Sequence, residues 1–530
     1  MLKSLSLAGL LSLGAASLAL AQEPQRGGVL NFTAPYASSF GTLDTVSSPM
    51  IQEQFITLAI HRSLYSWDSH ANQPVLELAA SVDVSDDGLT HTYHLLPDAV
   101  FHNGKPFTAD DIIHTYKRIA DAANSMPGAS HLRGIKGLEA FGRGEAPEIE
   151  GLVKIDDHTI AITFETTGEP GYALMQATTA ILPANVTADE QAVNPVGLGA
   201  FKFVEHIPGS QLVVERFDDY YEEGKPYLDR VNIIVMAEGA GRDVAFRNRE
   251  IDVSVLGPAQ YQDYLNDDSL KDHLLEVAET FTRIVGFNRG AVEAFQDKRV
   301  RQAVNHAINS DLIIERLAKG KAVRAVSWLP VGSPAFDDGA QAYAYDPDKA
   351  RKLLKEAGYE DGFEFEVTAG PNESWGVPII EAILPMLAQV NITVRPRPVD
   401  GSALSDHVTK GDFQAYMWSS QTGPDPLNAL RCFWSQTVQS ACNYTLFDNP
   451  EFDSLYEAAL AERDRDAQMA LLKQANNLIQ DEAPVWFFNY NKAVMAYQPW
   501  VHGLVPNATE LALQPYDEIW IDDTAPASRR

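Results

Sequence analysis

The sequence predicts an α/β protein of two lobes. Its 530 residues exceed what one hydrophobic core accommodates, because single cores stop growing at about 250–300 residues. Strand-like and helix-like patterns alternate along the whole chain after residue 21. Residues 363–398 read as strand, helix and strand, an order that implies a parallel pair joined by a right-handed crossover.

Composition limits the classes of partner. The chain is 45% hydrophobic and 21% charged, as soluble globular proteins are. Its net charge of −31 argues against a nucleic-acid partner, because phosphate backbones require clustered Lys and Arg.

The first residues have the pattern of an export signal. Lys3 precedes an apolar run over 5–20, and Ala19-Leu20-Ala21 offers a signal-peptidase site. The run is too weak for a membrane anchor, and no cysteine follows the cleavage site for a lipid anchor. We therefore expect residues 1–21 to be a cleaved signal peptide and the mature protein to be periplasmic.

Cys432 and Cys442 are the only cysteines. In an oxidising compartment a disulfide between them is the natural interpretation, with two free buried thiols as the alternative. No histidine lies nearby, so we expect no metal site there, and we expect no cofactor.

In the N-terminal half, periodicity predicts strands and one capped helix. Residues 89–95 alternate, with Tyr93 and Leu95 on one face. Thr108 is placed to cap a helix whose stripe includes Ile112 and Tyr116. Further strand patterns cover 158–164, 210–217 and 229–236.

In the C-terminal half, helices dominate. Residues 297–311 form an amphipathic pattern. A second helix has Asp346 as N-cap, Pro347 at its first position and Gly358 at its end. Long helical patterns follow over 450–481, and then the aromatic run "VWFFNY".

Motifs of catalysis are missing from the sequence. There is no GxxxxGK[ST], GxGxxG, HExxH or GxSxG, and a strand would send His91 and His94 to opposite faces. We therefore expect a protein that is not an enzyme. An exported hydrolase with an unrecognised site, a chaperone and a chemoreceptor partner stay open as alternatives.

Four segments carry a family resemblance: 78–119, which contains "DDGLTHTYHLLPDAVFHNGKPFTADD", then 287–314, 345–359 and 449–460. In order and spacing they are similar to the periplasmic solute-binding proteins of ABC importers, family 5, the oligopeptide, dipeptide and nickel-binding group. The resemblance covers nearly the whole chain after residue 21.

This resemblance implies a two-lobed Venus-flytrap fold, class II-like, with an additional subdomain in lobe one. Lobe one would comprise 22–275, with 490–530 returning to it, and lobe two 276–489. A monomer would close by hinge motion on a small-molecule solute. It would then deliver the solute to an inner-membrane ABC permease.

The solute is suggested by two departures from the family's peptide binders. Those proteins hold the ligand's α-ammonium with an Asp in a W-x-x-D-x-x-DP loop, and here Thr422 takes that place in "WSSQTGPDP". The carboxylate-binding Arg of dipeptide binders has no counterpart in 370–376. We expect a peptide or peptide-like ligand other than a simple dipeptide, with an opine or an oligosaccharide as alternatives.

The candidate ligand-binding residues are mostly aromatic or neutral polar, a set that suits such ligands. Arg431 is available for a carboxylate, and Trp418 is the foremost candidate because it begins the loop. Each tryptophan has core packing as an equal alternative, and Asp425 suits a turn cap. The full set is Phe40, Trp375, Trp418, Ser420, Gln421, Thr422, Asp425, Arg431, Trp434, Trp486, Asn489 and Asn491.

Overall fold

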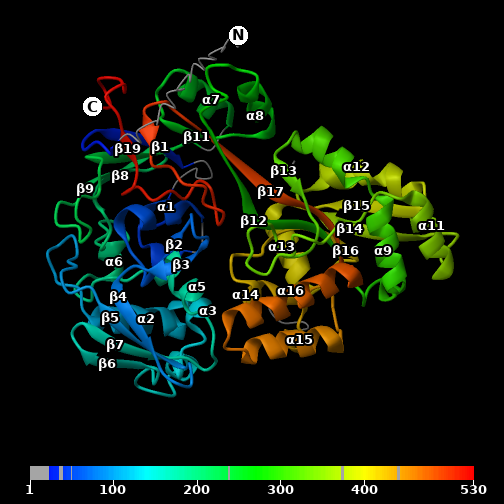
Figure 1. Cartoon of the computed structure of the whole chain (residues 1–530), viewed down its shortest axis with the longest axis horizontal. Helices are drawn as coiled ribbons and strands as arrows, with labels where there is room; N and C mark the ends of the chain where they lie inside the picture. The colour runs from blue at the N-terminus through cyan, green and yellow to red at the C-terminus, as the bar shows by residue number, and fades with distance from the viewer. Residues whose placement is uncertain (1–22, 35–39, 49–50, 237–238, 372–374, 438–441) are drawn as a thin grey trace, which may run out of the picture.

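Two bodies joined by two long antiparallel strands make up the computed structural model (Figure 1). The strands are β12 (Leu274–Phe287) and β17 (Val485–Tyr497). The structure describes residues 23–34, 40–48, 51–236, 239–371, 375–437 and 442–530. The expected signal peptide lies outside these ranges.

The first lobe contains two four-stranded sheets. One has the order β1-β10-β9-β8, with β1 parallel to β10 and the other pairs antiparallel. The other, β4-β5-β7-β6, is antiparallel throughout and forms a subdomain with α2 (Ala109–Ala120). The strands are β1 (Val29–Ala34), β4 (Ala79–Val84), β5 (Thr90–Leu95), β6 (Leu152–Asp156), β7 (Thr159–Thr163), β8 (Phe201–Ile207), β9 (Gln211–Arg216) and β10 (Arg230–Val235).

The strand and the capped helix predicted in this lobe are confirmed. Strand β5 buries Tyr93 and Leu95 on one face, and His94 turns to the other face, where it meets Asp83. Helix α2 begins with a capping box at Thr108, which satisfies two backbone N–H groups at once.

The second lobe is built on a mixed sheet of order β11-β17-β12-β16-β14-β15, with β13 also paired to β17. β14 and β15 are parallel, and α12 (Val377–Ala388) lies between them in the chain, as the strand–helix–strand pattern predicted. The strands are β11 (Val253–Val255), β13 (Ala322–Arg324), β14 (Phe363–Ala369), β15 (Ile392–Pro398) and β16 (Ala415–Gln421).

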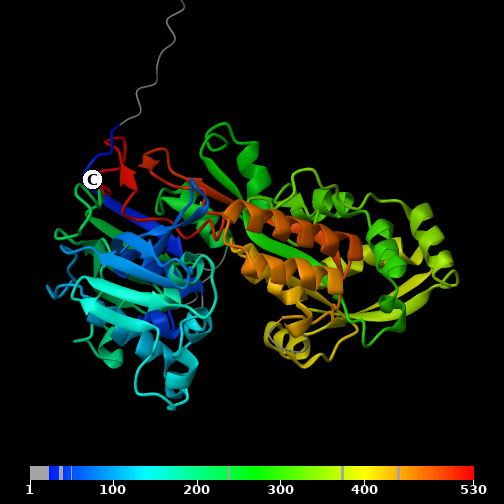
Figure 2. The ribbon, with the colours of Figure 1, turned by 60° about the horizontal axis from the view of Figure 1, so that its bottom comes forward.

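Helices cover this sheet, and the predicted ones are present. Asp346 caps α11 (Pro347–Glu356) by accepting from the Lys349 backbone N–H at 2.9 Å. Figure 2 shows α15 and α16, in orange, side by side. This pair is α15 (Pro450–Ala461) and α16 (Arg465–Glu482), and the lobe's other long helices include α9 (Lys298–Ala307) and α13 (Gly401–Lys410).

Shorter elements complete the fold. In the first lobe and its border they are α1 (Ile51–Ile60), β2 (Tyr65–Asp68), β3 (Gln73–Leu76), α3 (Ala129–Leu132), α4 (Leu138–Gly142), α5 (Gly171–Leu174), α6 (Ala188–Gln191), α7 (Gly239–Arg247), α8 (Pro258–Leu265), β18 (Val501–His502) and β19 (Trp520–Ile521). In the second they are α10 (Ser310–Ile313) and α14 (Pro426–Leu430). No helix in the described ranges is long and apolar enough to cross a membrane.

The junction of the lobes is a break in one strand pair. The ladder between β12 and β17 is interrupted between Ala278 and Thr282. Each lobe has its own hydrophobic cores on either side of this point. The expected boundaries at 275/276 and 489/490 fall inside β12 and β17 and stay a prediction.

Candidate functional site

A cavity of about 650 Å³ lies where the first lobe meets the second, within the roughly 300–1,000 Å³ typical of small-molecule sites. Most of its wall comes from the end of α1, the β2–β3 hairpin, residues 175–178 and the C-terminal segment 505–518. Phe281 of β12 and Pro424 of the loop after β16 complete it. The cavity therefore borders both the connecting strand β12 and a loop of the second lobe.

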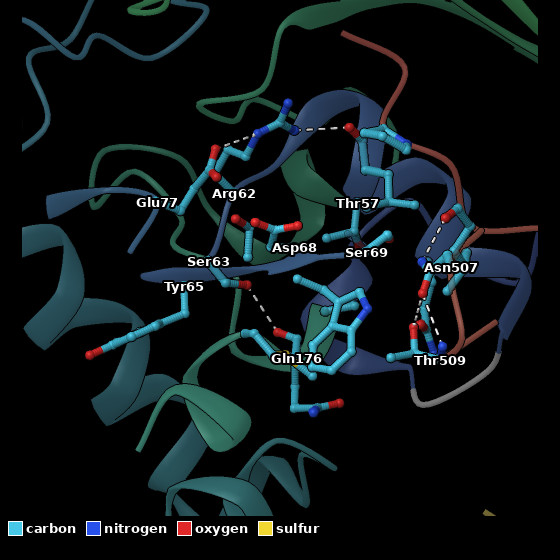
Figure 3. Close-up of a pocket in the computed structure, with 18 of the residues that line it drawn as sticks. Thr57, Arg62, Ser63, Tyr65, Asp68, Ser69, Glu77, Gln176, Asn507 and Thr509 are labelled. Carbon is cyan, nitrogen blue, oxygen red and sulfur yellow. Dashed lines mark hydrogen bonds and ion pairs between the residues drawn. The ribbon is translucent and has the colours of Figure 1, made fainter. Parts of the chain in front are cut away.

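Ion pairs hold one side of the cavity. The Arg62 guanidinium contacts the Glu77 carboxylate at 3.0 Å and the Asp517 carboxylate at 3.2 Å. Lys225 Nζ contacts Glu222 at 2.8 Å and Glu518 at 3.2 Å. Figure 3 shows Arg62 and Glu77 across the cavity from Asn507 and Thr509.

Several polar groups on the wall have no hydrogen-bond partner among the described residues. They are both ring nitrogens of His61, Oγ1 of Thr178 and Nε1 of Trp67. His61 is 1% exposed and Thr178 7%. A buried polar group without a partner costs about 1–3 kcal/mol, so the wall presents hydrogen-bonding capacity that a ligand or water can use.

Burial, then the nearby His102 and Arg62, lowers the pKa of His61 to about 3. Its imidazole is therefore neutral at physiological pH, with one nitrogen able to donate and the other able to accept. Around Arg62 and Lys225 the wall is charged, and around His61 it is neutral and polar.

Asp68 ends β2 at the cavity. Its Oδ1 accepts from the backbone N–H groups of His70 and Ala71, at 2.8 and 2.9 Å. These bonds, that of Ala71 first, lower the pKa of Asp68. Asp68 therefore presents a carboxylate whose turn geometry is already fixed (Figure 3).

Of the eleven candidate residues whose side chains the structure describes, none lines this cavity. Two of them belong to hydrophobic cores. Trp486 is 0% exposed, stacks on Phe488 with ring centroids 4.9 Å apart, and donates from Nε1 to Ser310 Oγ at 3.1 Å. Phe40 is buried in the first lobe against His206.

Thr422 and Asp425 both form hydrogen bonds with backbone groups. Thr422 is 2% exposed, and both its backbone N–H and its Oγ1 donate to the Thr280 carbonyl at 2.9 Å. Asp425 caps α14 by accepting from the Leu427 N–H at 3.0 Å, the role that suits a turn cap. Burial raises the pKa of Asp425 to about 6.

The second-lobe aromatic candidates also contact protein. Trp434 Nε1 donates to Glu457 Oε1 at 3.2 Å, and its ring lies against Tyr456. Trp418 and Trp375 are half-buried and pack against the hydrophobic core. These contacts favour the packing alternative that the sequence left open.

The remaining candidates lie on the loop after α14, on β16 and on β17. The Arg431 carbonyl accepts from Thr437 Oγ1. Ser420 is half-buried on β16, next to Gln421, whose side chain lies outside the described part. Asn489 is fully buried away from the cavity, and neither of its amide atoms has a described partner.

Asn491 belongs to the junction. Its Oδ1 accepts from the Arg283 guanidinium at 2.7 Å, and its Nδ2 donates to Glu279. It therefore ties β17 to β12 at the interruption of the ladder and does not line the cavity.

The predicted disulfide is confirmed: Cys432 and Cys442 are bonded, with Cα atoms 4.9 Å apart. Among the described residues, no group of three or more His, Cys, Asp or Glu is arranged to hold a metal ion.

Sequence reasoning missed the cavity because its wall is assembled from distant segments. The one local signal is "SLYSWDSH" at 63–70, where polar, acidic and aromatic residues follow each other. Arg62 meets Asp517 across 455 positions, and no spacing rule reports such a pair.

Known proteins match this chain along most of its length. The model of bacterial extracellular solute-binding proteins, family 5, matches residues 73–441. Heme-binding protein A of Haemophilus influenzae is 28% identical over 430 residues, 77% of each chain. The dipeptide-binding protein of Escherichia coli is 25% identical over 476 residues, 85% of this chain and 87% of that protein.

Solved structures agree on the fold. The periplasmic binding protein DppA of Helicobacter pylori, in complex with the peptide STSA, superposes with a TM-score of 0.75 at 23% identity, covering 94% of this chain and 98% of that one. AgaA of A. tumefaciens R10, in complex with agropinic acid, gives 0.73 at 24% identity, covering 93% and 99%. With two lobes, an interlobe cavity and a family match over most of its length, the chain belongs to the bacterial extracellular solute-binding proteins of family 5.

Proposed function

We propose that this protein is the solute receptor of an ABC importer, that it captures a peptide or peptide-like compound between its lobes, and that it presents this ligand to an inner-membrane permease. The observation that carries the proposal is the interlobe cavity, whose wall combines the first lobe with Phe281 and Pro424. A ligand that touches both sides stabilises the closed arrangement by its differential affinity. The relatives' names, among them dipeptide-binding and glutathione-binding proteins, support a peptide ligand.

The junction beside the cavity suits hinge motion. Within the interrupted ladder, Glu279 accepts from the Leu511 backbone N–H at 2.8 Å, and the Thr280 N–H donates to the Ala508 carbonyl at 2.9 Å. The C-terminal segment that lines the cavity is thus bonded to the strand that connects the lobes. Rotation about this point would change the shape of the cavity directly.

Direct hydrogen bonds join the lobes at the rim of the cleft. Arg465 Nη2 of the second lobe donates to Tyr172 Oη of the first at 3.1 Å. Arg463 Nη1 donates to the Asp86 carbonyl at 3.0 Å. A single hydrogen bond contributes about 0.5–1.5 kcal/mol net, so a bound ligand that touches both lobes would add to the stability of the closed form.

Binding and release require no covalent chemistry, and we propose that the protein is not an enzyme. We further propose that residues 1–21 are removed on export, that the mature chain is a periplasmic monomer, and that the lobes divide near 275/276 and 489/490.

A ligand screen on the purified chain from residue 22 tests this function. We expect defined di- to pentapeptides to raise the melting temperature, because a ligand at 100 times its Kd stabilises the folded state by about 2.7 kcal/mol. Mass spectrometry should recover the peptide intact. The melting temperature is also measured with opines and with oligosaccharides, for comparison with the peptides.

Two outcomes would contradict the proposal. Cleavage of the peptide would establish a hydrolase. Stabilisation by an opine or an oligosaccharide, with none by any peptide, would assign the receptor to that other ligand class.

A further inference from the structure

The charged groups on the cavity wall are strongly unbalanced. Among the described lining residues, two permanent cations, Arg62 and Lys225, face six carboxylates, which leaves an excess of four negative charges. The carboxylates are Asp68, Glu77, Glu222, Glu510, Asp517 and Glu518. Because the three lining histidines bring no permanent charge, the imbalance disfavours an anionic ligand group and favours a cationic one.

Both cations are already occupied. Arg62 contacts Glu77 and Asp517, and Lys225 contacts Glu222 and Glu518. Neither is therefore free to bind a ligand carboxylate without breaking an existing ion pair.

Asp68 stands outside this network. Its Oδ1 is taken by two backbone N–H groups, whereas its Oδ2 has no hydrogen-bond or ion-pair partner among the described residues. Trp67, its neighbour on β2, also lines the cavity, and aromatic rings attract cations. This corner can accept a positive charge without displacing any protein group.

Buried polar groups without partners indicate independently that something binds here. Both ring nitrogens of His61 and Oγ1 of Thr178 lie more than nine-tenths buried on the wall without a described partner. Protein interiors leave few such groups unsatisfied. A neutral imidazole and a hydroxyl can each accept a hydrogen bond from an N–H donor.

The second-lobe loop offers no competing carboxylate inside the cavity. The Thr422 hydroxyl donates to the Thr280 carbonyl, and Asp425 Oδ1 accepts from the Leu427 N–H as the cap of α14. Among the described side chains of this loop, only that of Pro424 reaches the cavity. Recognition of a positive charge would therefore fall to the first lobe.

We propose that the cavity selects ligands that carry an ammonium or a guanidinium group and that Asp68 is the anion that binds this group. The proposal rests on the peptide-receptor function above and specifies its ligand class. The positive charge has two possible sources, the α-ammonium of a peptide and a Lys or Arg side chain.

Isothermal titration calorimetry with matched tripeptides tests the proposal. The series is Ala-X-Ala with X as Lys, Arg, norleucine, citrulline or Glu, each with a free and with an acetylated N-terminus. We expect a peptide with a cationic group to bind at least about tenfold more tightly than its neutral counterpart, the weaker end of what a charge-assisted hydrogen bond contributes. The acetylated arm separates the α-ammonium from the side chain as the source.

Two variants assign the effect to Asp68. Asp68→Asn keeps an oxygen for the His70 and Ala71 N–H groups and removes only the charge, so we expect the preference to fall to within about twofold, because the charge-assisted part of the bond is lost. Asp156→Asn is the matched control. Asp156 makes the same kind of turn, accepting from the His158 N–H at 2.8 Å, but lies on the β6–β7 hairpin outside the cavity. We expect it to leave the preference unchanged.

The outcomes separate the two proposals. Equal binding of cationic and neutral peptides would overturn charge selection and leave the peptide receptor standing. A preference that survives in Asp68→Asn, or is lost equally in Asp156→Asn, would overturn the role of Asp68. Failure of every tripeptide to bind, while opines or oligosaccharides do, would overturn the proposed function itself.

Discussion

The two sides of the cleft use polar and aromatic residues in opposite ways. On the second lobe, the loop at 418–435 is rich in both, and Thr422, Asp425 and Trp434 all have protein partners. On the first lobe, His61 and Thr178 have hydrogen-bonding groups with no described partner. The comparison teaches that a binding surface is marked by unsatisfied polar groups that line a cavity, and less by the types of residue gathered in one loop.

The largest expected effect separates two tryptophans, one from each side. Trp486→Ala should lower the free energy of unfolding by about 3–5 kcal/mol, because it empties a fully buried position. Trp67→Ala should lower it by about 1 kcal/mol or less, because this half-buried ring lies at the cavity. Urea denaturation of the ligand-free variants measures both values.

Ligand titration completes this pair. Trp67→Ala should weaken peptide binding, whereas folded Trp486→Ala should retain it. A stability loss in Trp67→Ala as large as that in Trp486→Ala would mean that Trp67 serves the core and that the two sides do not differ in this respect.

The second effect is a difference in the pH dependence of stability. Burial lowers the pKa of His61 from 6.5 to about 3. Below pH 6.5 the unfolded chain therefore binds a proton that the folded chain does not, and stability is lost as pH falls. Burial raises the pKa of Asp425 from 3.8 to about 6. Between pH 3.8 and about 6 the folded chain keeps the Asp425 proton that the unfolded chain loses, so stability is lost as pH rises.

Two variants therefore shift the pH profile in opposite directions. Relative to wild type, His61→Gln should gain stability at about pH 4.5 compared with pH 7.5, at up to about 1.4 kcal/mol per pH unit. Asp425→Asn, which keeps an oxygen to cap α14, should gain about 1 kcal/mol at pH 7.5 and little at pH 4.5. Urea unfolding at the two pH values checks both signs. Parallel shifts in the two variants would contradict the assigned environments.

Much of the fold could be predicted from the sequence, because its signals are local. The alternation in β5, the Thr108 cap of α2 and the Asp346-Pro347 start of α11 each depend on neighbours within a few positions. The family assignment followed from four ordered segments, and the model match over 73–441 agrees with it. The spacing of Cys432 and Cys442 was likewise enough to predict their bond.

The site could not be predicted in the same way. Strand β17 is buried on both faces from Val485 to Tyr490, so its aromatic run gives no sign of whether Trp486 faces core or cleft. The cavity joins Arg62 to Asp517 and β2 to the C-terminal segment, contacts that depend on how the sheets and the tail pack. Residue type pointed to the second lobe, whereas the cavity wall, visible only in three dimensions, lies mostly in the first.

The smallest expected effect is the most direct test of that contrast, because it applies one substitution to both sides. Thr422→Val removes the Oγ1 bond to the Thr280 carbonyl and should cost about 1 kcal/mol of unfolding free energy while leaving peptide affinity unchanged. Thr178→Val removes a hydroxyl that has no described partner. It should leave the ligand-free protein as stable as wild type, or slightly more stable, and should weaken peptide binding. Chemical denaturation measures the unfolding free energy of each variant, and calorimetry measures its peptide affinity. If Thr178→Val destabilised the free protein as Thr422→Val does, the hydroxyl would be satisfied within the protein, and Thr178 would not offer the cavity a free hydrogen-bonding group.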